Sequence, residues 1–138
     1  MRLEVAKTAP GAAEFAARLI ATVLGVAIGR RTRASLALSG GTSPLPMLRA
    51  LAREPLEWSA VHVYQVDERV VARGDSARNL VALHEILVWR GPLPRRNLHP
   101  MWVDRADLSG ATHSYAEELT QVAGDPPIVN IGTVVQAS

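Results

Sequence analysis

The chain has 138 residues, enough to bury a hydrophobic core, since a folded chain of this size hides roughly two-thirds of its unfolded surface. Apolar residues make up 48% and charged residues 20% of the sequence, which excludes an intrinsically disordered chain. The formal net charge is only +2 and cysteine is absent, so nothing demands a nucleic-acid partner, and disulfide or thiolate sites are excluded. We expect a single cytoplasmic domain with no membrane partner.

The N-terminal part of the chain predicts a strand, a helix and a second strand. Residues 2–6 alternate between polar and apolar side chains, which is a weak edge-strand pattern. Residues 11–29 carry apolar side chains at helical spacing. The longest apolar stretch, from Phe15 to Ile28, is interrupted by Arg18 and Gly25, and we expect it to be too short to span a bilayer. Residues 34–38 are apolar enough for a short buried strand.

A pair of glycines, Gly40 and Gly41, follows this strand with hydroxyl side chains on both sides. Thr42 or Ser43 is expected to cap the next helix, and Pro44 suits its first turn. The unpaired N–H groups at a helix start, together with the helix dipole, attract an anion, and glycines let a phosphate approach the backbone closely. The alternative is a plain tight turn, because neither a P-loop nor a G-x-G-x-x-G motif is present.

Strand and helix patterns continue to alternate along the rest of the chain. We expect the helix that follows the two glycines to end near Arg53. After it, we expect strands at 58–66, 98–103 and 128–135 and helices at 79–89 and 108–122. This order is typical of an α/β fold with a parallel sheet and right-handed crossovers. Ligands of such sheets bind beyond the carboxyl ends of the strands.

Charged residues stand at the end of the second buried strand. Asp67, Glu68 and Arg69 follow it directly, so they and the glycine loop are expected to face one pocket. Arg69 could hold a phosphate through two parallel hydrogen bonds. The alternative is a solvated turn with an internal ion pair. Asp75 or Ser76 is expected to cap the helix that comes next.

The four histidines are not predicted to be catalytic, because none stands at the carboxyl end of a strand beside a glycine. Their positions are His62, His84, His99 and His113. No pair of them has the spacing of a metal site, so we expect no bound metal.

Three motifs in order and at their spacing resemble the N-terminal half of the 6-phosphogluconolactonase family: LSGGTSP at 38–44, VDERVV at 66–71 and DSARNL at 75–80. The resemblance runs over about residues 3–127. Members of that family hydrolyse 6-phosphoglucono-1,5-lactone to 6-phosphogluconate in the pentose phosphate pathway. The resemblance implies an α/β, modified Rossmann-like three-layer fold with a mainly parallel sheet, shared with the glucosamine-6-phosphate deaminases, and a phospho-sugar lactone as the small-molecule partner.

The resemblance also implies which residues bind the substrate, and it implies that no cofactor takes part. The expected substrate-binding residues are Ser39, Gly40, Gly41, Thr42, Asp67 and Arg69. Among them, Arg69 is expected to contact the substrate phosphate, with Asp67 nearby.

The sequence departs from the family pattern after Pro127. Family members continue with a G-M-G-x-D-G-H segment whose histidine is taken to activate the hydrolytic water, whereas residues 128–138 contain no Asp-Gly-His. We therefore expect the domain over residues 1–138 to be incomplete at its C-terminal side, with no catalytic residue and little or no lactonase activity in this chain alone. The alternatives are a non-catalytic sugar-phosphate-binding or degenerate fragment, and a deaminase-like isomerase. The corresponding segment of the deaminases resembles Asp-Glu-Tyr, whereas this chain has Asp-Glu-Arg at 67–69.

Overall fold

The computed structural model describes residues 3–72, 75–103, 106–124 and 131–132. Its helices are α1 (Ala9–Arg31), α2 (Leu45–Ala52), α3 (Asn79–Leu83) and α4 (Leu108–Ala123). Its strands are β1 (Ala34–Leu38), β2 (Val61–Gln65), β3 (Leu98–His99) and β4 (Ile131–Gly132). Short helical segments are η1 (Trp58–Ala60), the π-helical η2 (His84–Trp89), which continues α3, and η3 (Arg95–Asn97).

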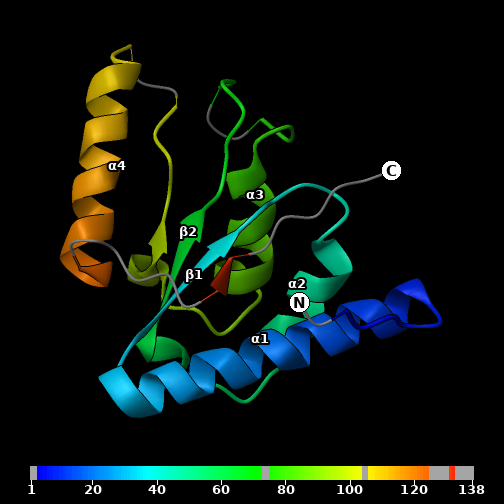
Figure 1. The fold of residues 1–138 in the computed structure, drawn as a ribbon. Coiled ribbons are helices and arrows are strands. Elements are labelled where there is room, and N and C mark those ends of the chain that lie inside the picture. The colour runs from blue at the N-terminus through cyan, green and yellow to red at the C-terminus, as the bar shows by residue number, and fades with distance from the viewer. Residues whose placement is uncertain (1–2, 73–74, 104–105, 125–130, 133–138) are drawn as a thin grey trace.

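The strands form one sheet in the order β3-β2-β1-β4, and all of its described pairs are parallel. Leu36 of β1 lies opposite Val63 on one side and Ile131 on the other. Val63 in turn lies opposite Leu98 of β3. Because the strands are parallel, their carboxyl ends meet at one edge of the sheet, which is the edge where the predicted motifs follow β1 and β2 (Figure 1). The prediction of an α/β fold with a parallel sheet is confirmed.

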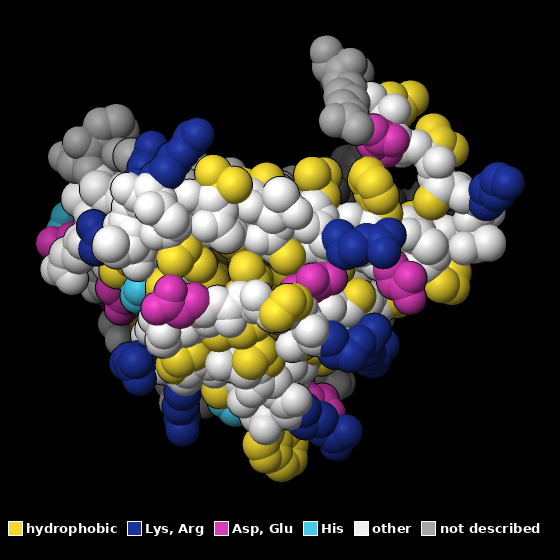
Figure 2. Space-filling view, turned by 90° about the horizontal axis from the view of Figure 1, so that it is seen from below, with side chains coloured by type: hydrophobic (Ala, Val, Ile, Leu, Met, Phe, Trp, Pro, Cys, Tyr) yellow, Lys and Arg dark blue, Asp and Glu magenta, His cyan; other side chains and the backbone are white. Residues whose placement is uncertain are grey.

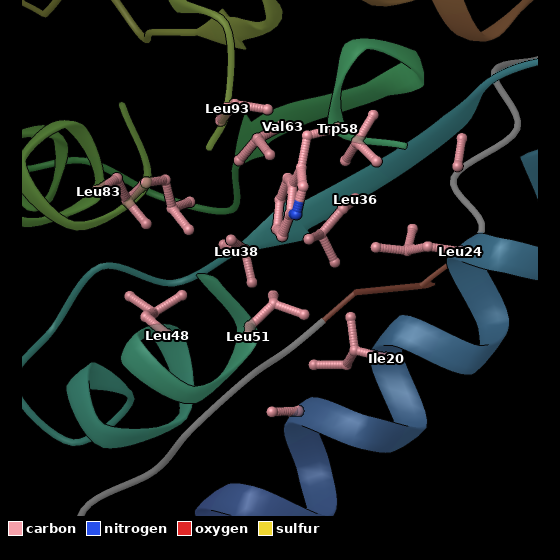
Figure 3. Close-up of a cluster of buried hydrophobic side chains, with 14 of the residues drawn as sticks. Ile20, Leu24, Leu36, Leu38, Leu48, Leu51, Trp58, Val63, Leu83 and Leu93 are labelled. Carbon is pink, nitrogen blue, oxygen red and sulfur yellow. The ribbon is translucent and has the colours of Figure 1, made fainter. Parts of the chain in front are cut away.

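Helices cover both faces of this sheet, so the expected three layers are present. On one face, Ile20 and Leu24 of α1 and Leu48 of α2 point toward Leu36 and Leu38 of β1 (Figure 3). On the other face, the hydroxyl group of a tyrosine in α4 bonds to the backbone of β2. Alternate residues of the strands therefore serve two different layers, as the period of two of a β-strand requires.

Helix α1 begins and ends at clear signals. Thr8 caps its N-terminus by accepting a hydrogen bond from the Gly11 amide at 3.1 Å, and Pro10 fits the first turn. Thr32, with a φ of 66°, ends it in the left-handed region. The helix has 23 residues, more than the stretch from Phe15 to Ile28 that the prediction considered, and by length and composition alone it could cross a membrane. That test is weak evidence for a span, since a core helix passes it too.

The outer side of α1 carries apolar side chains as well as its inner side. Phe15, Leu19 and Val26 are 39 to 50% exposed, whereas Ile20 and Leu24 are buried in the core. Figure 2 shows α1 across this face, with hydrophobic side chains along the helix and on the surface next to it. Lys and Arg side chains lie at separate points around these hydrophobic side chains.

Two expectations about local structure are wrong. Residues 3–6 form no strand; Leu3 and Val5 are more than 80% exposed, so a strand there would bury nothing. β3 ends at His99, because Pro100 has no N–H group to continue the ladder. Of the predicted strand at 128–135, only Ile131 and Gly132 fall within the described residues, and they form β4.

Candidate functional site

The loop after β1 leads directly into α2, whose start has no side-chain cap. Pro44 occupies the N-cap position, so the prediction that Thr42 or Ser43 caps the helix is wrong. Two backbone bonds close the turn instead, from the Leu45 amide to the Thr42 carbonyl at 3.3 Å and from the Leu48 amide to the Pro44 carbonyl at 2.9 Å. An uncapped helix start next to a glycine loop is an environment that favours an anion.

Gly40 brings this loop against the start of α3. A Cβ atom at position 40 would lie 2.6 Å from both the Cβ and the carbonyl oxygen of Asn79, too close for any side chain. Only glycine permits this approach without a shift of the backbone. Gly41 has nothing within 4 Å of the corresponding position. The first and third sequence motifs are therefore in contact, although they are far apart in the chain.

Asn79 also connects the third motif to the second. Its side-chain amide donates hydrogen bonds to the Asp67 carboxylate at 3.0 Å and to the Asp67 carbonyl at 3.3 Å. Asp67 itself is exposed, whereas Asn79 is buried. The fold thus gathers the glycine loop, Asp67 and Asn79 at the carboxyl edge of β1 and β2, which supports the expectation that the two strand ends face one region.

Glu68 performs a different task from that of its neighbours, because it caps α3. Its carboxylate accepts hydrogen bonds from the backbone amides of Asn79 at 2.7 Å and Leu80 at 3.0 Å. It also accepts from the Arg69 amide at 2.7 Å and from the Gln65 side chain at 2.8 Å. Burial raises the pKa of Glu68, but these hydrogen bonds outweigh burial, and the net pKa lies below its ordinary value.

The expected cap from the DSARNL motif is therefore wrong. The Asp75 carboxylate accepts a hydrogen bond from the Ala77 amide at 2.8 Å, which closes a local turn before the helix, and the N-cap position of α3 is Arg78. The orphan amides at the start of α3 are served by Glu68 from another loop.

A buried arginine completes the support under this loop. The Arg78 Nε atom lies 3.5 Å from the Glu68 carboxylate, and the two side chains are 1% and 0% exposed. Arg78 also donates from Nη2 to the carbonyl of Met101, beyond the end of β3, at 3.1 Å. The ion pair of this loop therefore joins Glu68 to Arg78. Within the described part of the chain, no ion-pair partner faces the guanidinium of Arg69, which is exposed.

Sequence reasoning missed the roles of Glu68, Arg78 and Asn79 in this site. No spacing rule signals that the middle acid of Asp67, Glu68 and Arg69 turns inward while its neighbours face solvent. The one available signal is that an arginine precedes, and an asparagine begins, a helix that has no acidic residue in its first turn.

Two histidines meet elsewhere, on the face of the sheet covered by α4. His62 Nδ1 lies 3.0 Å from His99 Nε2, and the ring of His99 stacks on Tyr64 with centroids 4.5 Å apart. Burial lowers the pKa of both histidines, and for His62 the neighbouring His99 lowers it further. Among the residues that the structure describes, no group of three or more His, Cys, Asp or Glu side chains is placed to hold a metal ion.

Comparison with known proteins shows the family of this chain. The sequence model of the family described as Glucosamine-6-phosphate isomerases/6-phosphogluconolactonase matches residues 7–133. The chain belongs to this family. The family resemblance predicted from the motifs is thereby confirmed.

Several relatives of this chain with curated names are 6-phosphogluconolactonases. One from Synechocystis sp. is 36% identical over 104 residues, which are 72% of this chain and 42% of that protein. One from Mycobacterium tuberculosis is 32% identical over 119 residues, or 80% of this chain and 48% of that protein. The crystal structure of the Thermotoga maritima 6-phosphogluconolactonase superposes with a TM-score of 0.72 at 25% identity, covering 79% of this chain and 50% of that one. The chain therefore spans about half the length of these relatives.

Proposed function

We propose that the chain binds the phosphate of 6-phosphoglucono-1,5-lactone at the carboxyl edge of β1 and β2. The reaction that this site serves in the family is hydrolysis of the lactone to 6-phosphogluconate. The proposed contacts are the backbone and hydroxyl groups of Ser39, Gly40, Gly41 and Thr42, the guanidinium of Arg69, and Asp67 beside them.

One observation carries this proposal: the packing of Gly40 on Asn79, which in turn holds Asp67. This contact sets the uncapped start of α2 beside the loop that carries Arg69. The glycine loop at this helix start and an exposed guanidinium are complementary to one phosphate group, since the first offers backbone and hydroxyl donors and the second a planar pair of donors. The names of the relatives support a phospho-sugar lactone as the compound that carries this phosphate.

The chain is proposed to bind the substrate without supplying the base for hydrolysis. Residues 128–138 contain no Asp-Gly-His segment. Lactone hydrolysis needs a base within hydrogen-bond reach of the attacking water, and such a base contributes roughly 10²- to 10⁴-fold in rate. Asp67, the acid nearest the proposed contacts, is exposed to solvent.

Ligand binding tests the proposed phosphate contact. Calorimetric titration with 6-phosphogluconate is expected to give saturable binding that Arg69→Gln weakens about 10-fold or more, because a charge-assisted hydrogen bond pair is removed. Arg95→Gln, at an exposed arginine of η3, is the matched control and is expected to leave the affinity unchanged. Equal affinity for the wild-type chain and Arg69→Gln would show that the phosphate lies elsewhere.

Turnover tests the missing base and the alternative reaction separately. Lactone hydrolysis by the purified chain is expected to stay at the spontaneous rate, and a rate well above it would overturn the proposal that no base is present. The deaminase-like alternative would release ammonia from glucosamine 6-phosphate. We expect no release of ammonia, because Arg69 stands at the position where the deaminase pattern has a tyrosine.

A further inference from the structure

A second basic region lies outside the motifs, in a groove between α2 and η2. The groove has a volume of about 380 Å³, within the range of ligand sites, which run from about 300 to 1,000 Å³. Arg49 of α2 and Arg53, which caps the end of α2, line one side, and Arg90, at the end of η2, lines the other. Leu45 and Ile86 add apolar surface between them.

The charges in this groove are unbalanced. Three guanidinium groups line it together with one carboxylate, that of Glu85, which lies 3.4 Å from Nε of Arg90. Arg49 and Arg53 are exposed, and neither has an ion-pair partner within the described part of the chain. They stand four residues apart on one helix, where like charges repel each other. A bound anion would relieve that repulsion.

The groove is separate from the proposed phosphate site, although the same helices form both. α2 starts at the glycine loop and has eight residues, so its far end lies about 12 Å from its start. η2 continues α3, which starts at Asn79. The three guanidinium groups of the groove therefore lie where the two helices end, whereas the proposed phosphate site lies where they begin; Leu45, the first residue of α2, also lines the groove, but none of the proposed phosphate-binding residues does.

We propose that this groove binds a small organic polyanion with at least two phosphate or carboxylate groups, held by Arg49 and Arg53 on one side and Arg90 on the other. Guanidinium groups bind either kind of acid through paired hydrogen bonds. Two acidic groups are needed to engage both sides of the groove, and the apolar lining accommodates the carbon skeleton between them. Such a ligand would hold α2 and η2 together.

Binding of pyrophosphate and of citrate tests the proposal on the whole chain. With ionic strength held constant, either probe is expected to shift the NMR signals of Arg49, Arg53 and Arg90, with a dissociation constant of about 1 mM or tighter. Tighter binding of pyrophosphate identifies phosphate groups as the preferred ligand, and tighter binding of citrate identifies carboxylates. If neither probe shifts these signals at about 10 mM, the proposal is wrong.

Paired variants with equal loss of charge distinguish a site from general attraction. The double variant Arg49→Gln and Arg53→Gln is expected to weaken binding about 10-fold or more. The control Arg18→Gln and Arg95→Gln removes two exposed charges outside the groove and is expected to change the affinity less than twofold. Equal weakening by both pairs would overturn the proposal. All four side chains are exposed, so the folded state is retained, and raised melting temperatures with ligand provide a second readout.

Discussion

Two strand–loop–helix junctions lie side by side at the carboxyl edge of the sheet, and they treat the start of their helices in opposite ways. At the β2–α3 junction, the carboxylate of Glu68 accepts hydrogen bonds from the first amides of the helix. At the β1–α2 junction, no side chain caps the helix, and glycines occupy the loop. The positive end of one helix dipole is thus matched by a carboxylate of the protein, whereas that of the other has no side-chain cap.

This difference in capping indicates that the β2–α3 junction supports the structure, and it favours the β1–α2 junction as the proposed ligand site. Glu68 and its partner Arg78 are buried, so they fix the loop that carries Asp67 and Arg69. The glycine loop rests on that fixed part through Asn79. A rigid support under a loop with free donors is the arrangement that a binding site needs.

The largest expected effect comes from the β2–α3 junction, where Glu68 caps the helix. Glu68→Gln keeps the shape of the side chain but leaves Arg78 buried without its carboxylate, which is expected to cost about 3 to 5 kcal/mol of the free energy of unfolding. Urea unfolding measures this cost, with the exposed Glu57→Gln as control.

The pH dependence of stability in wild type and Glu68→Gln tests whether the Glu68 carboxylate causes this difference. Because the pKa of Glu68 is lowered in the folded state, its contribution is present above the ordinary pKa and is lost as pH falls through the folded value. The difference between wild type and Glu68→Gln should therefore shrink at low pH. A cost below about 1 kcal/mol at neutral pH would contradict the role assigned to Glu68.

The next largest effect on stability is expected at the β1–α2 junction, where Gly41 provides a control next to Gly40. Gly40→Ala places a methyl group against Asn79 and is expected to destabilise the fold by about 1 to 3 kcal/mol, since overpacking forces the loop to move. It should also weaken 6-phosphogluconate binding. Gly41→Ala meets no atom within 4 Å and should change stability far less. Equal unfolding curves for the two variants would mean that the loop does not rest on Asn79.

A smaller effect is expected from a region that belongs to neither junction. Burial lowers the pKa values of His62 and His99 in the folded state, so the unfolded chain binds more protons as pH falls below the ordinary value of about 6.5. The melting temperature should therefore decrease from pH 7 toward pH 5. His99→Gln should reduce that dependence, while the exposed His113→Gln should not. An unchanged pH dependence in His99→Gln would place its origin elsewhere.

The sequence predicted the parts of the fold that depend on local pattern. The spacing of apolar residues indicated α1, and the apolar run at 34–38 coincides with β1. Alternation of strand and helix indicated the parallel sheet, and therefore the edge where the motifs meet. Pro100, which has no N–H group to donate, is the reason visible in the sequence for the early end of β3.

The rest depends on contacts between distant residues, which no periodicity reports. Glu68 caps a helix that begins eleven positions further along the chain, so the residues just before the helix, Asp75 and Ser76, give no sign of it. The approach of Gly40 to Asn79 is likewise a tertiary contact. The assignment of substrate-binding residues, including Arg69, stays a prediction.

The central claim is that the junction between β1 and α2 receives the phosphate. An amide NMR titration of the chain with 6-phosphogluconate tests it most directly, with gluconate, which lacks the phosphate, as the control ligand. We predict the largest shifts at Gly40, Gly41, Thr42 and Arg69, and much smaller shifts with gluconate. Shifts confined to the groove around Arg49 and Arg53, or equal shifts with both ligands, would contradict the claim.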